Sequence, residues 1–468
     1  MLRMQTIRAA LLIFCAGICA SACAAQDNPQ SSPGTPPAPA FGQNAPVLSP
    51  DNPPVTGLDQ PSLDLRSATR SFFAPALQLS ESADTNGGNQ LGGSDLESIT
   101  RVIGALDLQK FWTKSDLFLE YLGGAAFYGN PYQVKQLQDV GIEGVTRWRT
   151  GQATLRDSFS YLPDGSFQIG YGGLPGLGLT NTGMGIAGQG TALPGSLTNE
   201  QFGSVGDIPR LANTAIVDAV QAISPVSAIT VVAGYSNAHF YDPTHTLINS
   251  DQVVAEGGYS HLISRHDQIG AIYAFQLFQF PQNTGGEVFV HVFNLRWSHT
   301  LTGRLSLIAG AGPQYIDLQE GGNASYWSLS ARVQLHYKMG RSSVIASYEK
   351  FTSAGSGFFA GANTQAARLG YIRPLARTWQ FFGDLNYSHN TKIQQSFLGV
   401  NANHYDGVAV EGILRKHLGR TYDFFTIYRF GDVSFNAPVC ITGSCGRSAQ
   451  RQTGTIGVEW HPRPMRIE

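Results

Sequence analysis

Residues 329–338 read LSARVQLHYK, and their polarity alternates at every step. In an extended chain the apolar positions fall on one face, namely Leu329, Ala331, Val333, Leu335 and Tyr337, and the polar positions fall on the other, namely Ser330, Arg332, Gln334, His336 and Lys338. A helix would scatter these charges around its axis, whereas a strand separates them cleanly. The stretch therefore predicts a β-strand with one apolar and one polar face.

The same pattern recurs along the chain, for example in TWQFFGDLNYSHN (378–390) and TIGVEW (455–460). It predicts eighteen strands, near 72–82, 97–111, 116–128, 134–148, 151–162, 211–223, 226–242, 251–264, 267–280, 286–300, 303–318, 325–338, 342–355, 363–374, 377–391, 403–417, 420–433 and 449–462. Tight connections such as LTGR, MGR and HLGR alternate with generally longer ones such as SAGSGFFAGAN. Short turns at one end and longer loops at the other are typical of outer-membrane barrels.

The composition points to the same kind of protein. Charged residues make up 14% of the chain, well below the roughly 25% of soluble domains, while aromatic residues reach 11%. A net charge of −2 gives no basic footprint, so we expect no nucleic-acid partner. No apolar run after residue 25 approaches the roughly 18 residues of a spanning helix. A closed barrel is then the remaining route into a membrane.

The N-terminal stretch MLRMQTIRAALLIFCAGICASACAAQ carries basic residues, an apolar run and small residues in that order. This order predicts a signal peptide over residues 1–25, with lipidation of Cys23 as the alternative. Residues 26–66 are rich in Pro, Gly and Ser and are expected to form a disordered periplasmic tether. Residues 67–468 are then left for the barrel.

With its export signal, its alternating strands and a last strand TGTIGVEWH, the chain resembles the porin-like outer-membrane β-barrels of Gram-negative bacteria. The resemblance implies an all-β, closed antiparallel transmembrane barrel of about 18 strands, with 16 to 20 as the expected range. It also implies outer-membrane lipid and the barrel-insertion machinery as partners. Such barrels commonly end on an aromatic residue, whereas here PRPMRIE follows Trp460 and His461.

The longest connection, residues 163–210, is a glycine-rich insertion that contains Gly183-Met-Gly185-Ile-Ala-Gly188. This matches the G-x-G-x-x-G of dinucleotide sites, but neither a buried strand before it nor a helix after it is predicted, so no nucleotide is expected. By the alternation of the connections the insertion lies on the extracellular side. We expect it either to fold into the lumen as a constriction or partial plug, or to form an external lid or mobile loop.

Strand parity directs a set of polar side chains to the lumen, where they would set solute preference or merely solvate the wall. They are Arg332, Gln334, His336, Lys338, Glu349, Arg368, Asp384, Asn386, Glu411 and Arg415. Because acids and bases are mixed, strong selectivity by charge is not expected. Cys440 and Cys445 are predicted to close a small disulfide loop, since a metal site would need further ligands nearby.

These features predict a passive outer-membrane channel or porin-like transporter and not an enzyme, with no cofactor and no metal. A hydrolase is the enzyme alternative, but no G-x-S-x-G motif occurs. A conduit for polysaccharide export or for hydrophobic solutes is a second alternative, and a structural or adhesive barrel with an occluded lumen is a third. A soluble propeller would show repeats of about 40 residues, and none is found. The pattern does not reveal the transported solute or the oligomeric state.

Overall fold

The computed structural model describes residues 71–162 and 208–467, apart from short gaps at 89, 130–131, 243–245, 265, 282–285, 320–323, 395–399, 442 and 464. The predicted signal peptide, the predicted tether and nearly all of the insertion, with its glycine motif, lie outside these residues. None of the described residues belongs to a helix long and apolar enough to cross a bilayer.

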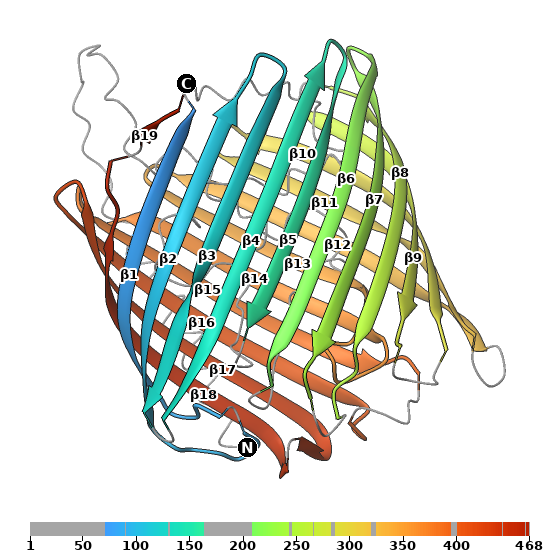
Figure 1. Ribbon diagram of the computed structural model, residues 1–468. Helices are drawn as coiled ribbons and strands as arrows, with labels where there is room; N and C mark the ends of the chain where they lie inside the picture. The colour runs from blue at the N-terminus through green and yellow to red at the C-terminus, as the bar shows by residue number, and fades with distance from the viewer. Residues whose placement is uncertain are drawn as a thin grey trace. The chain divides into compact units, whose positions relative to one another are not determined.

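Eighteen long antiparallel strands form one closed ring, in which each strand pairs with the next and β18 pairs with β1 (Figure 1). They are β1 (Phe72–Asp84), β2 (Glu97–Phe111), β3 (Ser115–Gly129), β4 (Tyr132–Trp148), β5 (Gly151–Leu162), β6 (Arg210–Ser224), β7 (Ser227–Phe240), β8 (Ser250–Leu262), β9 (Asp267–Gln279), β10 (Val288–Thr302), β11 (Leu305–Leu318), β12 (Ala324–Met339), β13 (Ser342–Ser353), β14 (Ala362–Pro374), β15 (Trp379–Lys392), β16 (His404–Leu418), β17 (Tyr422–Ile441) and β18 (Ser444–Trp460). The predicted closed barrel of eighteen strands is confirmed.

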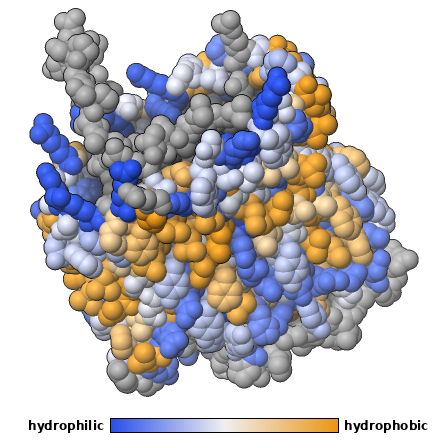
Figure 2. Space-filling view, turned by 45° about the horizontal axis from the view of Figure 1, so that its top comes forward, coloured by the Kyte–Doolittle hydropathy of each residue, from blue (hydrophilic) through white to orange (hydrophobic). Residues whose placement is uncertain are grey.

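The two faces of each strand behave as the alternation predicts. On β12, Leu329 and Val333 are 50% and 43% exposed on the outer wall, whereas Gln334 and His336 on the inner face are buried. Hydrophobic side chains cover much of the lateral wall in the view of Figure 2, and strongly hydrophilic side chains gather at its upper rim. An apolar exterior and a polar interior are the arrangement of a barrel that stands in a membrane.

Aromatic side chains mark both ends of the outer wall. Trp148, Trp379 and Trp460 lie where their strands meet the tight-turn end, and Tyr235 and Tyr387 lie toward the long-loop end. Eight residue steps separate Trp379 from Tyr387 on β15, which is about 27 Å along a strand and about 21 Å along the axis of a barrel whose strands tilt by roughly 40°. This matches the apolar band of an outer-membrane barrel.

The hairpin of β17 and β18 is longer than predicted. The sequence predicts a loop over residues 434–448, but β17 continues to Ile441 and β18 begins at Ser444. The ladder is irregular between Ser434 and Val439, where Pro438 cannot donate a ladder hydrogen bond, and regular pairing then resumes. The sequence signals a loop here because it is rich in residues that favour turns, yet the interruption is a local irregularity within one long hairpin.

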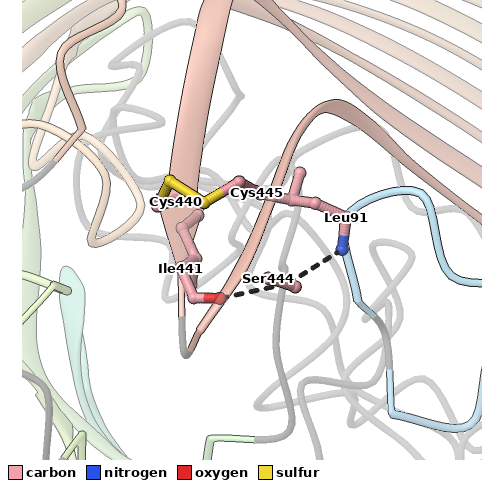
Figure 3. The surroundings of a disulfide bond; sticks show 5 residues. All are labelled: Leu91, Cys440, Ile441, Ser444 and Cys445. Carbon is pink, nitrogen blue, oxygen red and sulfur yellow. Dashed lines mark hydrogen bonds between the residues drawn. A yellow bond between two sulfur atoms is a disulfide. The ribbon is translucent and has the colours of Figure 1, made fainter.

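A disulfide joins Cys440 to Cys445 near the tip of this hairpin, with a Cα–Cα distance of 4.1 Å (Figure 3). The two cysteines face each other across the ladder. At the same place Ser444 Oγ donates to the Ile441 carbonyl and accepts a hydrogen bond from the Leu91 amide. The loop between β1 and β2 is thereby attached to the tip of the last hairpin.

The first and last strands meet in a long seam. Leu77 of β1 faces Trp460 of β18, and the pairing runs to Asp84 opposite Thr453. Inside the seam the Asp84 carboxylate pairs with the Arg451 guanidinium at 2.7 Å, and both side chains are buried. Beyond β18 a two-residue strand, β19 (Met465–Arg466), continues the pairing along β1 opposite Phe72 and Phe73. The tail after the last aromatic residue therefore extends the seam.

Candidate functional site

The inner wall of the barrel is the candidate site, because it gathers most of the buried charged side chains that the structure describes. On β12 to β17 several of the inner-wall charges contact a partner of opposite sign on a neighbouring strand. Arg332 pairs with Glu349 across β12 and β13 at 3.0 Å, and Arg368 pairs with Asp384 across β14 and β15 at 3.0 Å. Pairs of opposite charge on adjacent strands stabilise the sheet, and each charge partly offsets the cost of burying the other.

The pairs on β14 to β17 join into one network. Asn386 donates to the second oxygen of Asp384, and Asp384 lies directly opposite Glu411 in the ladder. Glu411 in turn accepts a hydrogen bond from Arg429 on β17. Four of the residues predicted to line the lumen, together with Arg429, therefore form one polar belt, which we call the charged belt: Arg368, Asp384, Asn386, Glu411 and Arg429.

Arg415 belongs to a second group nearer the tight turns. Its guanidinium contacts Glu459 at 2.8 Å and Asp423 at 3.7 Å. His417 shares the Asp423 carboxylate at 2.7 Å, and His461 approaches it at 3.5 Å. This group ties β16, β17 and the end of β18 together at the tight-turn end.

Three predicted residues do not join these groups. Gln334 and His336 are buried on the inner face of β12, where His336 Nε2 lies 2.9 Å from Ser343 Oγ. Lys338 has the same parity but is exposed beside the tight turn at Gly340. It therefore lies at the rim and not in the lumen.

Several inner-wall charges are not among the residues predicted from the sequence. Arg156 on β5 lies between Glu143 on β4, at 3.4 Å, and Asp218 on β6, at 3.0 Å. Arg429 and Arg451 were also missed, because the alternation on β17 and β18 is blurred by Gly, Ser and Thr. The usable signal was cross-strand pairing: once Glu411 is placed inward, the inward residue opposite it on the next strand is Arg429.

The long-loop end of the lumen is built differently, from apolar side chains. The loop between β13 and β14 carries Phe358 and Phe359, whose side chains are 1% and 0% exposed. Phe358 packs edge to face on Tyr405 and on Phe435, with ring centroids 5.1 Å and 5.2 Å apart. These rings belong to a larger buried cluster, which we call the mouth cluster: Leu91, Ile208, Phe240, Leu247, Phe358, Phe359, Ala362, Val400, Ala402, Tyr405, Val433, Phe435, Val439, Ile441 and Ala449.

The mouth cluster crosses the lumen. Phe240 lies on β7 and Tyr405 on β16, nine strands apart in a ring of eighteen, so the two strands stand on opposite sides of the barrel. The loop of residues 354–361 joins them through hydrogen bonds from the Ile248 amide to the Gly357 carbonyl, at 2.8 Å, and from the Val400 amide to the Phe358 carbonyl, at 3.2 Å. Part of the mouth is therefore bridged by this loop.

Glycine is required at the centre of the bridge. Gly357 has a φ of +81°, and a Cβ added there would lie 2.7 Å from the ring of Phe240. Only glycine combines this backbone conformation with so close an approach. The turn residues of SAGSGFFAGAN predict an ordinary outer loop, whereas its two adjacent phenylalanines, set among Gly, Ser and Ala, are the signal for an inward fold.

The arrangement can do two things chemically. The charged belt presents fixed positive and negative groups to whatever occupies the lumen, and these replace part of the hydration of a polar solute. Six residue steps separate Tyr405 of the mouth cluster from Glu411 of the belt on β16, about 20 Å along the strand. A solute entering from the loop end would therefore meet an apolar passage first and a charged one next.

Comparison with known proteins gives matches in structure only. No family model matches the chain, and no curated protein matches it. Among solved structures it is similar to OpdK of Pseudomonas aeruginosa with vanillate (11% identity, 83% of this chain and 98% of that one, TM-score 0.40). It is also similar to OccAB3 of Acinetobacter baumannii (11%, 84% and 99%, 0.41) and to a BenF-like porin of Pseudomonas fluorescens Pf-5 (10%, 84% and 99%, 0.41). The lumen itself, and not these likenesses, carries the functional inference.

Proposed function

We propose that this chain is a passive outer-membrane channel for small polar solutes of Gram-negative bacteria. The observation that supports this most directly is the contrast between its two walls, an apolar exterior and an interior lined by buried charged side chains. A barrel of this size encloses more space than its own side chains fill. Charged side chains on such an inner wall can bind and select the solutes or ions that pass them.

We propose that the charged belt favours solutes that carry both polar and charged groups over simple ions of one sign. In the belt each guanidinium lies beside a carboxylate, as with Arg368 and Asp384 or Arg429 and Glu411. The electrostatic potential along this part of the inner wall therefore changes sign over short distances. A solute with neighbouring donors and acceptors can bind a guanidinium and a carboxylate at once. A simple ion is attracted by one of these groups and repelled by the other.

A second candidate function is a structural or adhesive barrel with an occluded lumen. The mouth cluster favours it, since buried aromatic side chains cross the loop end from β7 to β16. In that case the belt would serve to stabilise the inner wall only. A conduit for hydrophobic solutes would use the same apolar mouth but would have to carry its solute past the belt.

Conductance of the purified protein in a planar lipid bilayer tests the proposal. Stepwise insertions with a stable open level support a channel, and their size sets the width of the narrowest passage. Silence in the bilayer, with correctly folded protein recovered afterwards, would support the occluded barrel. Swelling of proteoliposomes in sugars, amino acids and sugar acids then separates polar solutes by size and charge.

We further propose that residues 1–25 direct export, that residues 26–66 form the tether and that the insertion at 163–210 adds a constriction or a lid. Support for these assignments comes from composition.

Mass spectrometry of the mature N-terminus tests whether residues 1–25 are removed and identifies any lipid on Cys23. Deletion of residues 172–190, followed by conductance measurement, tests the last: a larger open level supports a constriction within the lumen.

A further inference from the structure

A second cluster of polar side chains lies on the outer wall, away from the lumen. His389 and Asp406 face each other across β15 and β16, and their parity directs both side chains outward. The His389 Nδ1 atom lies 2.8 Å from Asp406 Oδ1. The same carboxylate oxygen accepts a hydrogen bond from the Tyr387 hydroxyl at 3.0 Å, so two donors fix the position of the carboxylate.

The other nitrogen of the same imidazole also has a partner. Thr391 Oγ1, two residues along β15 on the same face, lies 3.2 Å from His389 Nε2. A carboxylate on Nδ1 and a hydroxyl on Nε2 form the sequence of contacts that activates an alcohol nucleophile. The carboxylate holds the tautomer with the proton on Nδ1, and Nε2 is then free to accept the proton of the hydroxyl.

A second histidine–aspartate pair on the outer wall lacks this feature. His299 Nδ1 lies 2.7 Å from Asp267 Oδ1 near the tight-turn end. The ring of His299 stacks on Trp297 with centroids 5.2 Å apart, and within the described ranges no hydroxyl lies on its second nitrogen. The Asp406 group thus differs from the Asp267 pair by the hydroxyl on the second imidazole nitrogen. The Asp267 pair therefore provides a matched control.

The position of the group identifies the substrate that could reach it. Tyr387 belongs to the aromatic belt at the long-loop end, and His389 and Thr391 lie one and two outward positions beyond it. Aromatic belts mark the boundary between the hydrocarbon core and the head groups, which is the depth of the ester bonds of a lipid. His389 and Asp406 are 30% and 35% exposed on this surface.

We propose that Thr391, His389 and Asp406 form a lipid-facing catalytic group that hydrolyses the acyl esters of outer-leaflet lipids. The proton of Thr391 Oγ passes to His389 Nε2 while the oxygen attacks the ester carbonyl carbon. The bond to the lipid alcohol then breaks, and His389 returns the proton to that alcohol. Water, deprotonated by His389, attacks the resulting acyl-threonine ester, and a fatty acid leaves as Thr391 recovers its proton. Ester and water give alcohol and acid, with no redox change.

His404 is the further residue assigned to this site. Its ring centroid lies 5.3 Å from that of His389, and its backbone pairs with Thr391. An imidazole N–H beside the reacting carbonyl would donate a hydrogen bond to the negative oxygen of the tetrahedral intermediate and stabilise it. This assignment is independent of the channel, because the group lies on the opposite face of the wall from the charged belt.

The test uses purified full-length protein in mixed micelles with a phosphatidylethanolamine that carries labelled acyl chains. Wild-type protein should release labelled fatty acid, and T391A and H389A should lower the rate on the order of 10²- to 10⁴-fold, as expected for loss of a nucleophile or a general base. D406N and H404Q should lower it by smaller factors. T391S should retain activity, since it keeps a hydroxyl, and D267N should behave as wild type.

A fluorophosphonate probe gives a second readout. It should label the peptide that contains Thr391 in wild type and leave T391A unlabelled. Fold is checked for every variant by heat-modifiable migration on a gel and by conductance in a bilayer, which should not change. Absence of release and of labelling in folded wild-type protein would overturn the proposal, and so would release that is equal in wild type and T391A.

Discussion

Phe240 and Tyr405 stand on opposite walls of the barrel and are joined by one short loop, which places Gly357 against the first ring and Phe358 against the second. The mouth of the lumen is therefore set by packing between side chains and not by the diameter of the sheet. Because this packing involves loops as well as strands, it can be changed without changing the wall. This makes the mouth the most direct place to test whether solutes pass through the barrel.

Truncation of the bridging aromatic side chains should widen the mouth. F358A removes the ring that packs on Tyr405 and Phe435, and the lost packing should cost about 3–5 kcal/mol at the loop end. We expect a larger single-channel conductance in a planar bilayer with the barrel still heat-modifiable. F293A, which truncates an exposed ring on the outer wall, is the control and should leave conductance unchanged. Equal conductance for F358A and wild type would argue against the mouth cluster as the narrowest passage.

Removal of one charge from the belt should shift ion selectivity. D384N takes away the carboxylate that faces Arg368 at 3.0 Å, so positive charge exceeds negative charge at that point and anions should pass more readily. The stability cost should stay below the roughly 3–5 kcal/mol of a fully buried broken pair, because Arg368 is partly exposed. The reversal potential in a potassium chloride gradient measures the shift.

The double variant R368Q/D384N is the matched control for that experiment, since it removes both charges and keeps the belt neutral. Its reversal potential should return toward that of wild type. D251N, on the outer wall where Tyr235 donates to the carboxylate, should have no effect on selectivity. A shift in D251N as large as that in D384N would mean that the belt does not act on passing ions.

Loss of the disulfide should loosen the tip of the last hairpin and little else. C440S/C445S opens a short loop, for which chain entropy predicts a loss of about 2 kcal/mol. The β1–β2 loop should become more accessible as well, because Leu91 is attached to Ser444 at that tip. Hydrogen exchange followed by mass spectrometry should show faster exchange near residues 86–92 and 436–448. Protection across the rest of β17 and β18 should match that of the oxidised protein.

The tight-turn end should lose stability as the pH rises. The carboxylate of Asp423 raises the pKa of His461 above its ordinary value of 6.5. A raised folded pKa means that this contribution is complete below pH 6.5 and is lost as the pH rises through the folded value. The contribution of this pair to the free energy of unfolding should not exceed about 1 kcal/mol, because His461 is partly exposed.

Urea unfolding of wild type and H461Q from about pH 5 to about pH 9 measures this contribution. The difference in midpoint between the two proteins should be largest at the acid end and disappear at the alkaline end. A difference that grows with pH would contradict the assignment of His461 as the charged partner of Asp423.

Strand positions could be predicted from the sequence because each strand repeats a simple period and most connections contain strong turn signals. β2 and β5, for example, begin and end at the predicted residues. The hairpin of Cys440 and Cys445 was misjudged because an irregular ladder resembles a loop when only local composition is considered. The inward fold of Phe358 depends on contacts with β7 and β16. Both strands lie more than forty residues away in the sequence, one on each side of Phe358. Local periodicity contains no information on such contacts.

The candidate sites show the same division. Strand parity places Arg368, Asp384 and Glu411 on the inner face, but only the register between strands reveals that they join Arg429 in one network. The group of Thr391, His389 and Asp406 is hidden for the same reason, because its acid comes from the next strand and no motif within one segment records it. Residues that act together across a sheet are distant in sequence.

The buried pair of Asp84 and Arg451 links residues 367 positions apart, and this separation constrains how the barrel assembles. Apart from the pairings of β1 with β18 and with β19, the described strands pair only with their neighbours in the chain. Hairpins can therefore accumulate one after another while the two outermost edges stay open. Contacts of such long range form last and slowly, and open edges invite pairing with other chains. Assembly should therefore be limited by the joining of β1 to β18, and weakening that joint should slow maturation and increase aggregation far more than it lowers the stability of the finished ring.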